Sequence, residues 1–294
     1  MHPVDVRFNT LGKFDADLLR DIALSPQVSS LDVWFHGRDP YVPASLGSLT
    51  RIRTLAFLGV STLDGPLLAL ESSGGVVDLR IRQFTPALAN TTDEIDLLTK
   101  AISRQSELRK LTLQLPIDDL LDTFGELEPL NSVKELVIGK PAGEDSDIQS
   151  SRVEPFNLRK VTPDIAHLVN QGVPLKLMSA ESYPDSIRYL MIQGNRLTKE
   201  DVSCFSQLPR LRGLSLNFDE IDAEAVQAIT SMIQVRSISL TTDKLSPDAL
   251  APWERDCSLE RLNLRLQDVV SEANMIKKLR AAQPSLPVNG IPLR

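Results

Sequence analysis

Residues 187–197 read IRYLMIQGNRL, and the same pattern returns in LRGLSLNFDEI at residues 211–221 and in VRSISLTTDKL at residues 235–245. Each stretch begins with the phrase apolar-x-x-apolar-x-apolar, and successive phrases start 24 residues apart. A fixed period of roughly 20 to 50 residues is typical of solenoids, whose repeats stack on one another. The phrase therefore predicts a chain of stacked repeats.

The phrase covers most of the chain. Its nine clear copies begin at residues 28, 52, 76, 108, 133, 187, 211, 235 and 259. Two further copies are expected at the ends, at Val4–Val6 and Leu286–Val288, and a degenerate copy at Val153–Leu158. Because a solenoid grows by adding repeats, we expect one domain of about 11 or 12 repeats over residues 1–294.

The spacing is irregular between two regular blocks, residues 28–138 and residues 187–294. Residues 139–186 hold a polar loop and proline-containing turns in place of a clear phrase. Within this region the segment Thr162–Ile165 has the chemistry of a helix start, and Gly172 that of a helix end. We therefore expect a helix between these two points.

Each repeat is predicted to contain a strand followed by a helix. The end of each phrase has a period of two, which is typical of a short strand with one buried face. Asp222 precedes a helical stretch, and Ser246–Asp248 combines a capping serine with a proline and an acid. The sequence thus predicts an α/β fold, a right-handed curved solenoid with parallel strands on the concave face and helices on the convex face.

Residues 187–197 also fit the consensus leucine-x-x-leucine-x-leucine-x-x-asparagine-x-leucine, with isoleucine at two positions and Asn195 at the asparagine position. The chain therefore resembles leucine-rich-repeat proteins, and its outer segments are similar to those of bacterial repeats with helices. Asp219 and Asp243 take the asparagine position in the next two repeats. Earlier repeats depart from the consensus there, with Val60, Phe84, Pro116 and Pro141. The resemblance implies a concave protein-binding face, an incomplete asparagine ladder along the turns, and no shared catalytic residue.

Composition narrows the class of function. The chain has a net charge of −7 and 42% apolar residues, which favours solubility and argues against bulk binding of nucleic acid. Cys204 and Cys257 are expected to be reduced thiols, because a secreted scaffold of this size would often carry more cysteines. A redox or metal site is the poorer alternative, since none of the three histidines shares metal-ligand spacing with a cysteine. No run of signal-peptide length opens the chain, and no stretch approaches the roughly 20 apolar residues of a membrane span. We expect a cytoplasmic protein without membrane contact.

Catalytic motifs are missing from the sequence. It contains no Gly-x-x-x-x-Gly-Lys-[Ser/Thr] loop, no Gly-x-Gly-x-x-Gly and no Gly-x-Ser-x-Gly. Asp118 and Asp119 are adjacent acids, but neighbouring residues diverge on a helix and make a poor acid–base pair. The sequence therefore predicts no catalytic site, no metal and no cofactor.

Alternation along each strand places three residues of every phrase on the concave face. Trp34 and Leu58 occupy equivalent positions on adjacent strands, so we expect an exposed apolar pair, with Arg80 and Arg82 beside it. Aromatic and arginine side chains often dominate protein interfaces. The alternative is that a loop around residues 40–43 covers Trp34.

Further candidate binding residues follow from the same alternation. They are Gln114, Tyr189, Gln193, Asn217, Thr241 and Arg265. The zone from Gly213 to Thr241 is small, polar and uncharged, which suits either a protruding partner or an unused wet surface.

A column of basic residues precedes the strands. It consists of Arg53, Arg109, Lys134, Arg188, Arg212 and Arg236, and it is interrupted by Val77 and Glu260. In one interpretation the column attracts an acidic partner. In the other, its cations offset carbonyls at the C-terminal ends of the outer helices, for about 0.3–1 kcal/mol each.

The sequence as a whole predicts a non-enzymatic scaffold that binds an unidentified protein through its concave face, and the basic column favours an acidic partner. Two alternatives stay open. Exposed end repeats would drive self-association, because solenoid ends need polar caps. An anionic ligand or nucleic acid would use the basic column, although the net charge of −7 argues against nucleic acid.

Overall fold

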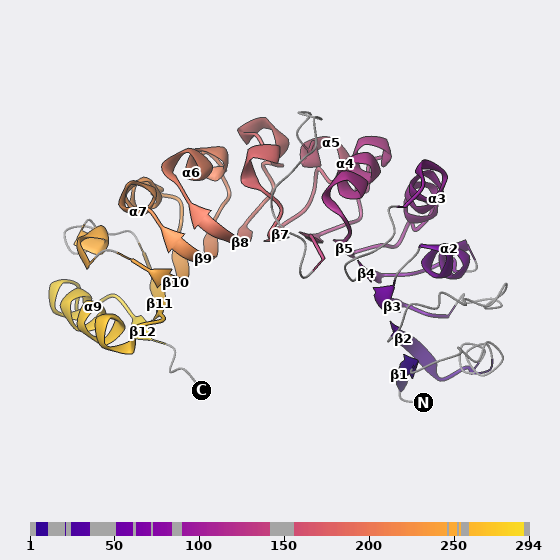
Figure 1. Ribbon diagram of the computed structural model, residues 1–294, viewed down its shortest axis with the longest axis horizontal. Helices are drawn as coiled ribbons and strands as arrows, with labels where there is room; N and C mark the ends of the chain where they lie inside the picture. The colour runs from indigo at the N-terminus through magenta and orange to yellow at the C-terminus, as the bar shows by residue number, and fades with distance from the viewer. Residues whose placement is uncertain are drawn as a thin grey trace. The chain divides into compact units, whose positions relative to one another are not determined.

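The computed structural model describes residues 4–10, 21, 25–35, 51–60, 63–71, 73–83, 90–141, 156–245, 247–251, 253 and 259–290. The chain forms two compact units, residues 1–165 and residues 166–294. In both units parallel strands follow one another in sequence order, with helices in the connections (Figure 1). This α/β arrangement is consistent with a repeat solenoid.

The first unit holds six of the described strands. They are β1 (Val4–Thr10), β2 (Val28–Phe35), β3 (Thr54–Val60), β4 (Asp78–Gln83), β5 (Lys110–Gln114) and β6 (Glu135–Gly139), each parallel to the next. The described helices are α2 (Asp64–Glu71), α3 (Thr92–Ser103), α4 (Ile117–Glu126) and α5 (Leu158–Val161). In Figure 1, α2, α3 and α4 lie on the same side of the strands, and each contacts the next.

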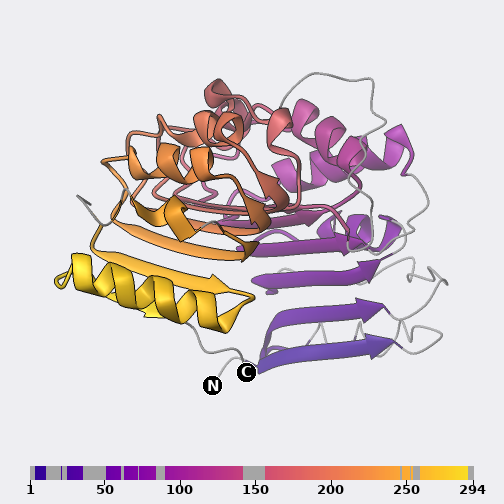
Figure 2. The same cartoon turned by 60° about the vertical axis from the view of Figure 1, so that its left-hand side comes forward.

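The second unit repeats this plan. Its described strands are β7 (His167–Gln171), β8 (Tyr189–Leu197), β9 (Gly213–Ile221), β10 (Ser237–Lys244), β11 (Arg261–Leu266) and β12 (Val288–Gly290). Its described helical segments are η1 (Leu175–Leu177), η2 (Ala180–Ser182), α6 (Lys199–Phe205), α7 (Ala223–Thr230), η3 (Pro247–Leu250) and α9 (Val269–Ala282). Figure 2 shows α9, in yellow, beside β11 and β12. In both units we call the sheet face opposite the helices the open face.

The central apolar residue of each phrase lies in register with that of the next repeat. In the first unit these residues are Leu31, Leu55, Leu79, Leu111 and Leu136. In the second unit they are Leu168, Leu190, Leu214, Ile238, Leu262 and Val288. Each is at most 2% exposed, so the stacked phrases form the core of each unit. The predicted register is confirmed for the clear copies on the described strands. Strands β1 and β12 occur near the two expected end copies, but the register is shifted by two residues, because Leu31 pairs with Val6 instead of Val4 and Leu262 pairs with Val288 instead of Leu286.

Local capping explains where several helices begin. Thr91 accepts a hydrogen bond from the Glu94 amide at 3.2 Å, and the Glu94 carboxylate accepts one from the Thr91 amide at 2.6 Å. This reciprocal capping box starts α3, and a second box of the same kind starts α6. Asp222 precedes α7 as predicted, but its carboxylate is held by Arg196 instead of capping the helix.

The predicted helix after Thr162 is wrong. Residues His167–Gln171 form strand β7, and the helix α5 comes earlier in the chain, at Leu158–Val161. Leu168 and Asn170 are the buried residues that alternate along β7. The phrase is therefore present in this repeat, with a polar residue at its last position.

Asn170 explains why the pattern missed this repeat. Its side chain is 1% exposed, donates to the Val173 carbonyl at 2.9 Å and accepts from the Val173 amide at 2.9 Å. These two bonds satisfy the buried amide where the chain turns at Gly172, whose φ of 82° suits glycine. The degenerate copy predicted at Val153–Leu158 is wrong, because Leu158 begins α5.

Three strands of the second unit run past the phrase. On β8, β9 and β10 the asparagine position is occupied by Asn195, Asp219 and Asp243, all exposed. The packing of Phe218 requires a glycine on the adjacent strand, because a Cβ at Gly194 would lie 2.8 Å from the Phe218 ring. Because Asn195, Asp219 and Asp243 are exposed, the side chains at the asparagine position do not form a buried ladder in these three repeats.

Candidate binding surface on the open strand faces

The open face carries the side chains that alternate with the core. On β4, Leu79 and Ile81 are buried, whereas Arg80 and Arg82 are partly exposed. In the first unit the strand register aligns the open-face positions into three rows. The first row is Asp5, Ser30, Thr54, Asp78, Lys110 and Glu135; the second is Arg7, Asp32, Ala56, Arg80, Thr112 and Val137; the third is Asn9, Trp34, Leu58, Arg82, Gln114 and Gly139.

The third row brings together four predicted binding residues. Trp34, Leu58, Arg82 and Gln114 are direct partners on successive strands, and neighbouring strands lie about 4.8 Å apart. Trp34 is partly exposed, but Leu58 is only 7% exposed, so the predicted exposed apolar pair is wrong at Leu58. Trp34 and Arg82 are thus the accessible side chains on either side of it.

Some sequence predictions concern positions that the structure does not describe. The loop around residues 40–43, considered as a cover for Trp34, lies outside the described residues. The same is true of Ser246 and Cys257.

Ion pairs neutralise most charges on the open face of the first unit. Arg80 donates from Nε to one oxygen of Asp78 at 3.1 Å and from Nη2 to the other. This hydrogen-bonded pairing with Asp78 raises the pKa of Arg80, against an opposing effect of burial. Two further pairs on this face are Lys110–Glu135 and Arg7–Asp32.

Arg82 differs from the other cations of these rows. Within the described residues no carboxylate pairs with its guanidinium, and its Nε is buried without a hydrogen-bond partner. Burial, followed by the nearby charge of Arg80, lowers the pKa of Arg82. A guanidinium that is partly removed from water and lacks a counter-ion favours an incoming anion.

In the second unit, Tyr189 is an exposed aromatic residue on the open face, with 50% of its surface accessible. Its ring lies against the imidazole of His167, with the centroids 4.7 Å apart and the planes at 34°. A Cβ added to Gly213 would lie 2.5 Å from Tyr189 Cδ1, so the ring also fills the space above this glycine. His167, Tyr189 and Gly213 are register partners on β7, β8 and β9. The ring is therefore held in place by both neighbouring strands.

Amides and hydroxyls lie further along the same face as this ring. The first row of the second unit is His167, Tyr189, Gly213, Ser237 and Arg261; the second is Val169, Met191, Ser215, Ser239 and Asn263; the third is Gln171, Gln193, Asn217, Thr241 and Arg265. None of these positions is acidic. The third row holds four predicted binding residues, which the register brings side by side: Gln193, Asn217, Thr241 and Arg265.

The basic column has a recurrent structural role. Three of its arginines each donate from Nη1 to a backbone carbonyl in the loop that leads from the following helix to the next strand. The pairs are Arg53–Gly75 at 2.9 Å, Arg109–Ser132 at 3.3 Å and Arg212–Gln234 at 2.8 Å. These bonds favour a structural role for the column, but the accepting carbonyls lie in the loops beyond α2, α4 and α7 and not at the helix ends, where they were expected.

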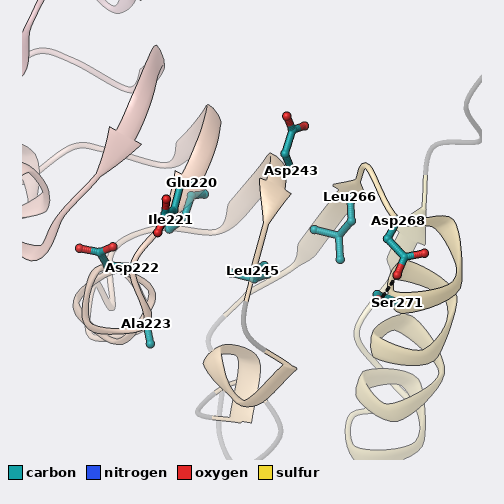
Figure 3. A pocket seen from close by; sticks show the side chains of 9 residues that line it. All are labelled: Glu220, Ile221, Asp222, Ala223, Asp243, Leu245, Leu266, Asp268 and Ser271. Atoms are coloured by element: carbon teal, nitrogen blue, oxygen red, sulfur yellow. Dashed lines mark hydrogen bonds between the residues drawn. The ribbon is translucent and has the colours of Figure 1, made fainter.

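A pocket of about 540 Å³ lies at the carboxyl ends of β9, β10 and β11, in the second unit (Figure 3). Its acidic lining residues are Glu220, Asp222, Asp243 and Asp268. Asp222 accepts from Arg196 at 3.0 Å, and Asp268 caps α9 by accepting from the Val270 amide at 3.0 Å. Hydrogen bonding, first from Ser271, lowers the pKa of Asp268. Acids that end successive strands were the sequence signal for this pocket, and the sequence reasoning did not use it.

Other kinds of site find little support among the described residues. No group of three or more histidine, cysteine, aspartate or glutamate side chains there could hold a metal ion. No helix in the described segments has the length and apolar character needed to cross a bilayer. Cys204 is a free, partly buried thiol that donates weakly to the Glu200 carbonyl at 3.7 Å, and burial raises its pKa. A raised pKa disfavours the reactive thiolate.

Comparison with known proteins does not assign a family. No family model matches the chain, and no curated protein matches its sequence. The repeat architecture is therefore inferred from the strand register and the burial of the apolar phrases. The leucine-rich-repeat resemblance stays a prediction.

Proposed function

We propose that this protein is a non-enzymatic interaction module of the leucine-rich-repeat type, which binds a protein partner through its open strand face. The observation that carries the proposal is Tyr189, half exposed on that face and held between His167 and Gly213. A large aromatic ring that is already fixed loses little conformational entropy when a partner covers it.

The surroundings of Tyr189 support a protein ligand. An aromatic side chain offers apolar contact area together with a hydroxyl that hydrogen-bonds, and tyrosine is enriched at the centres of interfaces. The second and third rows of this unit offer hydroxyls and amides, including Ser215, Gln193 and Asn217, which suit the backbone and polar side chains of a polypeptide.

The helical side of the units offers no comparable feature among the described residues. Large exposed apolar side chains outside the described strands are Leu97 on α3, Ile233 in the loop after α7 and Val270 on α9, at 47%, 77% and 69% exposed. They stand on separate elements, and single exposed apolar residues are ordinary on protein surfaces. We therefore place the partner on the strands.

Affinity capture with matched variants tests this function. Partners retained by the wild-type protein are expected to be lost with Tyr189→Ala and kept with Val270→Ala, which removes a more exposed apolar side chain from α9. If both variants retain the same partners, the strand face is not the binding surface.

Self-association is a second candidate, favoured by β1. Within the described residues, this seven-residue strand pairs along one edge only, with β2. An unpaired strand edge is a template for pairing with another chain. Light scattering over a range of concentrations would detect it as a mass that rises above 32.5 kDa.

A further inference from the structure

On the open face of the first unit, two of the described charges stand outside the described ion pairs. On the described strands β1–β6 its three rows contain four carboxylates and four cations, which are Asp5, Asp32, Asp78, Glu135, Arg7, Arg80, Lys110 and Arg82. Three carboxylate–cation pairs account for six of these charges. Arg82 therefore remains as the cation without a described counter-ion, while Asp5 lies on the edge strand β1.

The position of Arg82 defines what surrounds this charge. Its register partners are the buried Leu58 on β3 and Gln114 on β5. Trp34 lies two strands away in the same row, roughly 10 Å from Arg82 by strand spacing. The row therefore offers, in order, an aromatic ring, a buried aliphatic side chain, a guanidinium and an amide.

The chemistry of the guanidinium favours a single carboxylate. Its Nε lacks a partner and is removed from water, which leaves a buried donor unsatisfied. A carboxylate meets two N–H groups of arginine at once, in the same bidentate way in which Asp78 already engages Arg80. One carboxylate would therefore supply the missing counter-charge at the partly exposed guanidinium.

The rest of the face argues against a polyanion. Asp78, Asp32 and Glu135 belong to these rows and each is paired with a cation, so that Arg82 is the one cation of the described rows on this face left for an incoming anion. A nucleic acid or a phosphorylated surface would bring several negative charges to this single available cation, whereas one acidic side chain matches it in number.

We propose that Arg82 anchors a single carboxylate of a protein partner, carried on a peptide segment whose adjacent apolar side chain packs toward Trp34. This inference rests on the proposed function, because it assumes that the partner is a protein. It adds a second contact, in the first unit, and it specifies the chemistry of that contact.

Selection of short random peptides on the full wild-type chain tests the proposal. The selected peptides are expected to contain an aspartate, a glutamate or a free terminal carboxylate next to an apolar residue. Remaking each peptide with glutamine, asparagine or a terminal amide at that place identifies which carboxylate binds, and the loss in affinity is expected to be about ten-fold or more.

A double-mutant cycle then assigns the contact to Arg82. On Arg82→Gln, the acidic peptide and its amide analogue are expected to bind equally well, because the coupled partner has been removed. Arg212→Gln, an arginine of the basic column bonded to a loop carbonyl, serves as the control and is expected to retain the ten-fold difference. Arg82→Lys, which keeps the charge without the planar fork, is expected to retain part of it.

The outcomes separate this inference from the proposed function. Peptides without a carboxylate requirement, an unchanged difference on Arg82→Gln, or equal competition by inorganic phosphate would overturn the inference. A failure to select any peptide would overturn it as well. Loss of captured partners with Tyr189→Ala would still support the strand face as a binding surface, since Tyr189 belongs to the other unit.

Discussion

The ring of Tyr189 occupies the space that a β-carbon at residue 213 would need: the distance from that atom to Tyr189 Cδ1 would be 2.5 Å. Real side chains do not tolerate such an approach, so one of the two groups has to move. Glycine is required here for close approach and not for its backbone angles, because Gly213 does not have a positive φ.

Gly213→Ala is therefore expected to push the Tyr189 ring away from β9 and off His167. The cost of crowding one methyl group into packed surroundings is about 1–3 kcal/mol at most sites, less if the exposed ring swings freely into solvent. Chemical denaturation measures the stability, and the ring-current shifts of His167 in NMR spectra report the loss of stacking.

Gly125→Ala is the matched control for this substitution. A Cβ at Gly125 meets nothing within 4 Å, and the residue lies in α4, where alanine is favoured over glycine by about 1 kcal/mol. We expect this variant to be at least as stable as the wild-type protein. Equal behaviour of the two alanine variants would contradict the packing assigned to Tyr189.

Much of the fold was predictable from the sequence because the apolar positions of the phrase are the buried positions of each strand. Leu79 and Leu111 are separated by a 32-residue interval instead of 24, yet they are register partners, since stacking tolerates a longer connection. The burial of Leu58 was not predictable in this way. Alternation predicts the sheet face on which a side chain lies. Its exposure also depends on the size of the side chains on the adjacent strands, here Trp34 and Arg82, and the pattern does not contain that information.

The repeat containing β7 marks another limit, and it leads to a prediction. Asn170 is buried in a position where the other phrases carry an apolar residue, and it forms two hydrogen bonds with Val173. Asn170→Ala would leave a buried N–H and a buried C=O unsatisfied, so we expect a loss of about 2–4 kcal/mol of unfolding free energy.

The Asn170→Leu variant separates the packing of an apolar side chain at this position from the hydrogen bonds that asparagine makes. It restores the apolar pattern but still removes both hydrogen bonds, so it is expected to remain less stable than the wild-type protein in urea denaturation. A leucine variant as stable as the wild type would show that the turn at Gly172 does not need the asparagine.

Asp119 makes the stability of the first unit depend on pH. It is 8% exposed and accepts a hydrogen bond from Asn90, and burial, the largest effect, raises its pKa to about 6 from an ordinary 3.8. The folded state therefore binds this proton more tightly than the unfolded chain does. Its contribution to the free energy of unfolding is expected to increase as pH falls from above 6 toward 4, by about 3 kcal/mol at most.

Replacing Asp119 by asparagine tests this dependence. Asp119→Asn keeps an oxygen that accepts from Asn90 and removes the charge, so the variant is expected to gain stability at pH 7 and to lose the rise between pH 7 and 4. Asp118→Asn, at the exposed neighbouring position, is expected to reduce that rise only slightly, because the Asp118 charge is a minor cause of the raised pKa of Asp119. If both variants retain the rise, another group is responsible for it.

The basic column leads to the last prediction. Because Arg212 already donates to the Gln234 carbonyl at 2.8 Å, binding an anion would require exchanging that bond for another. Arg212→Gln is therefore expected to lower the unfolding free energy by about 1 kcal/mol or less, as exposed contacts of this kind do. It is expected to leave binding of a single-stranded oligonucleotide as weak as in the wild-type protein, at every salt concentration. Lys277→Gln, an exposed cation on α9, is the charge-matched control. Oligonucleotide binding that falls steeply with salt, and that weakens with Arg212→Gln but not with Lys277→Gln, would restore the column as a ligand site.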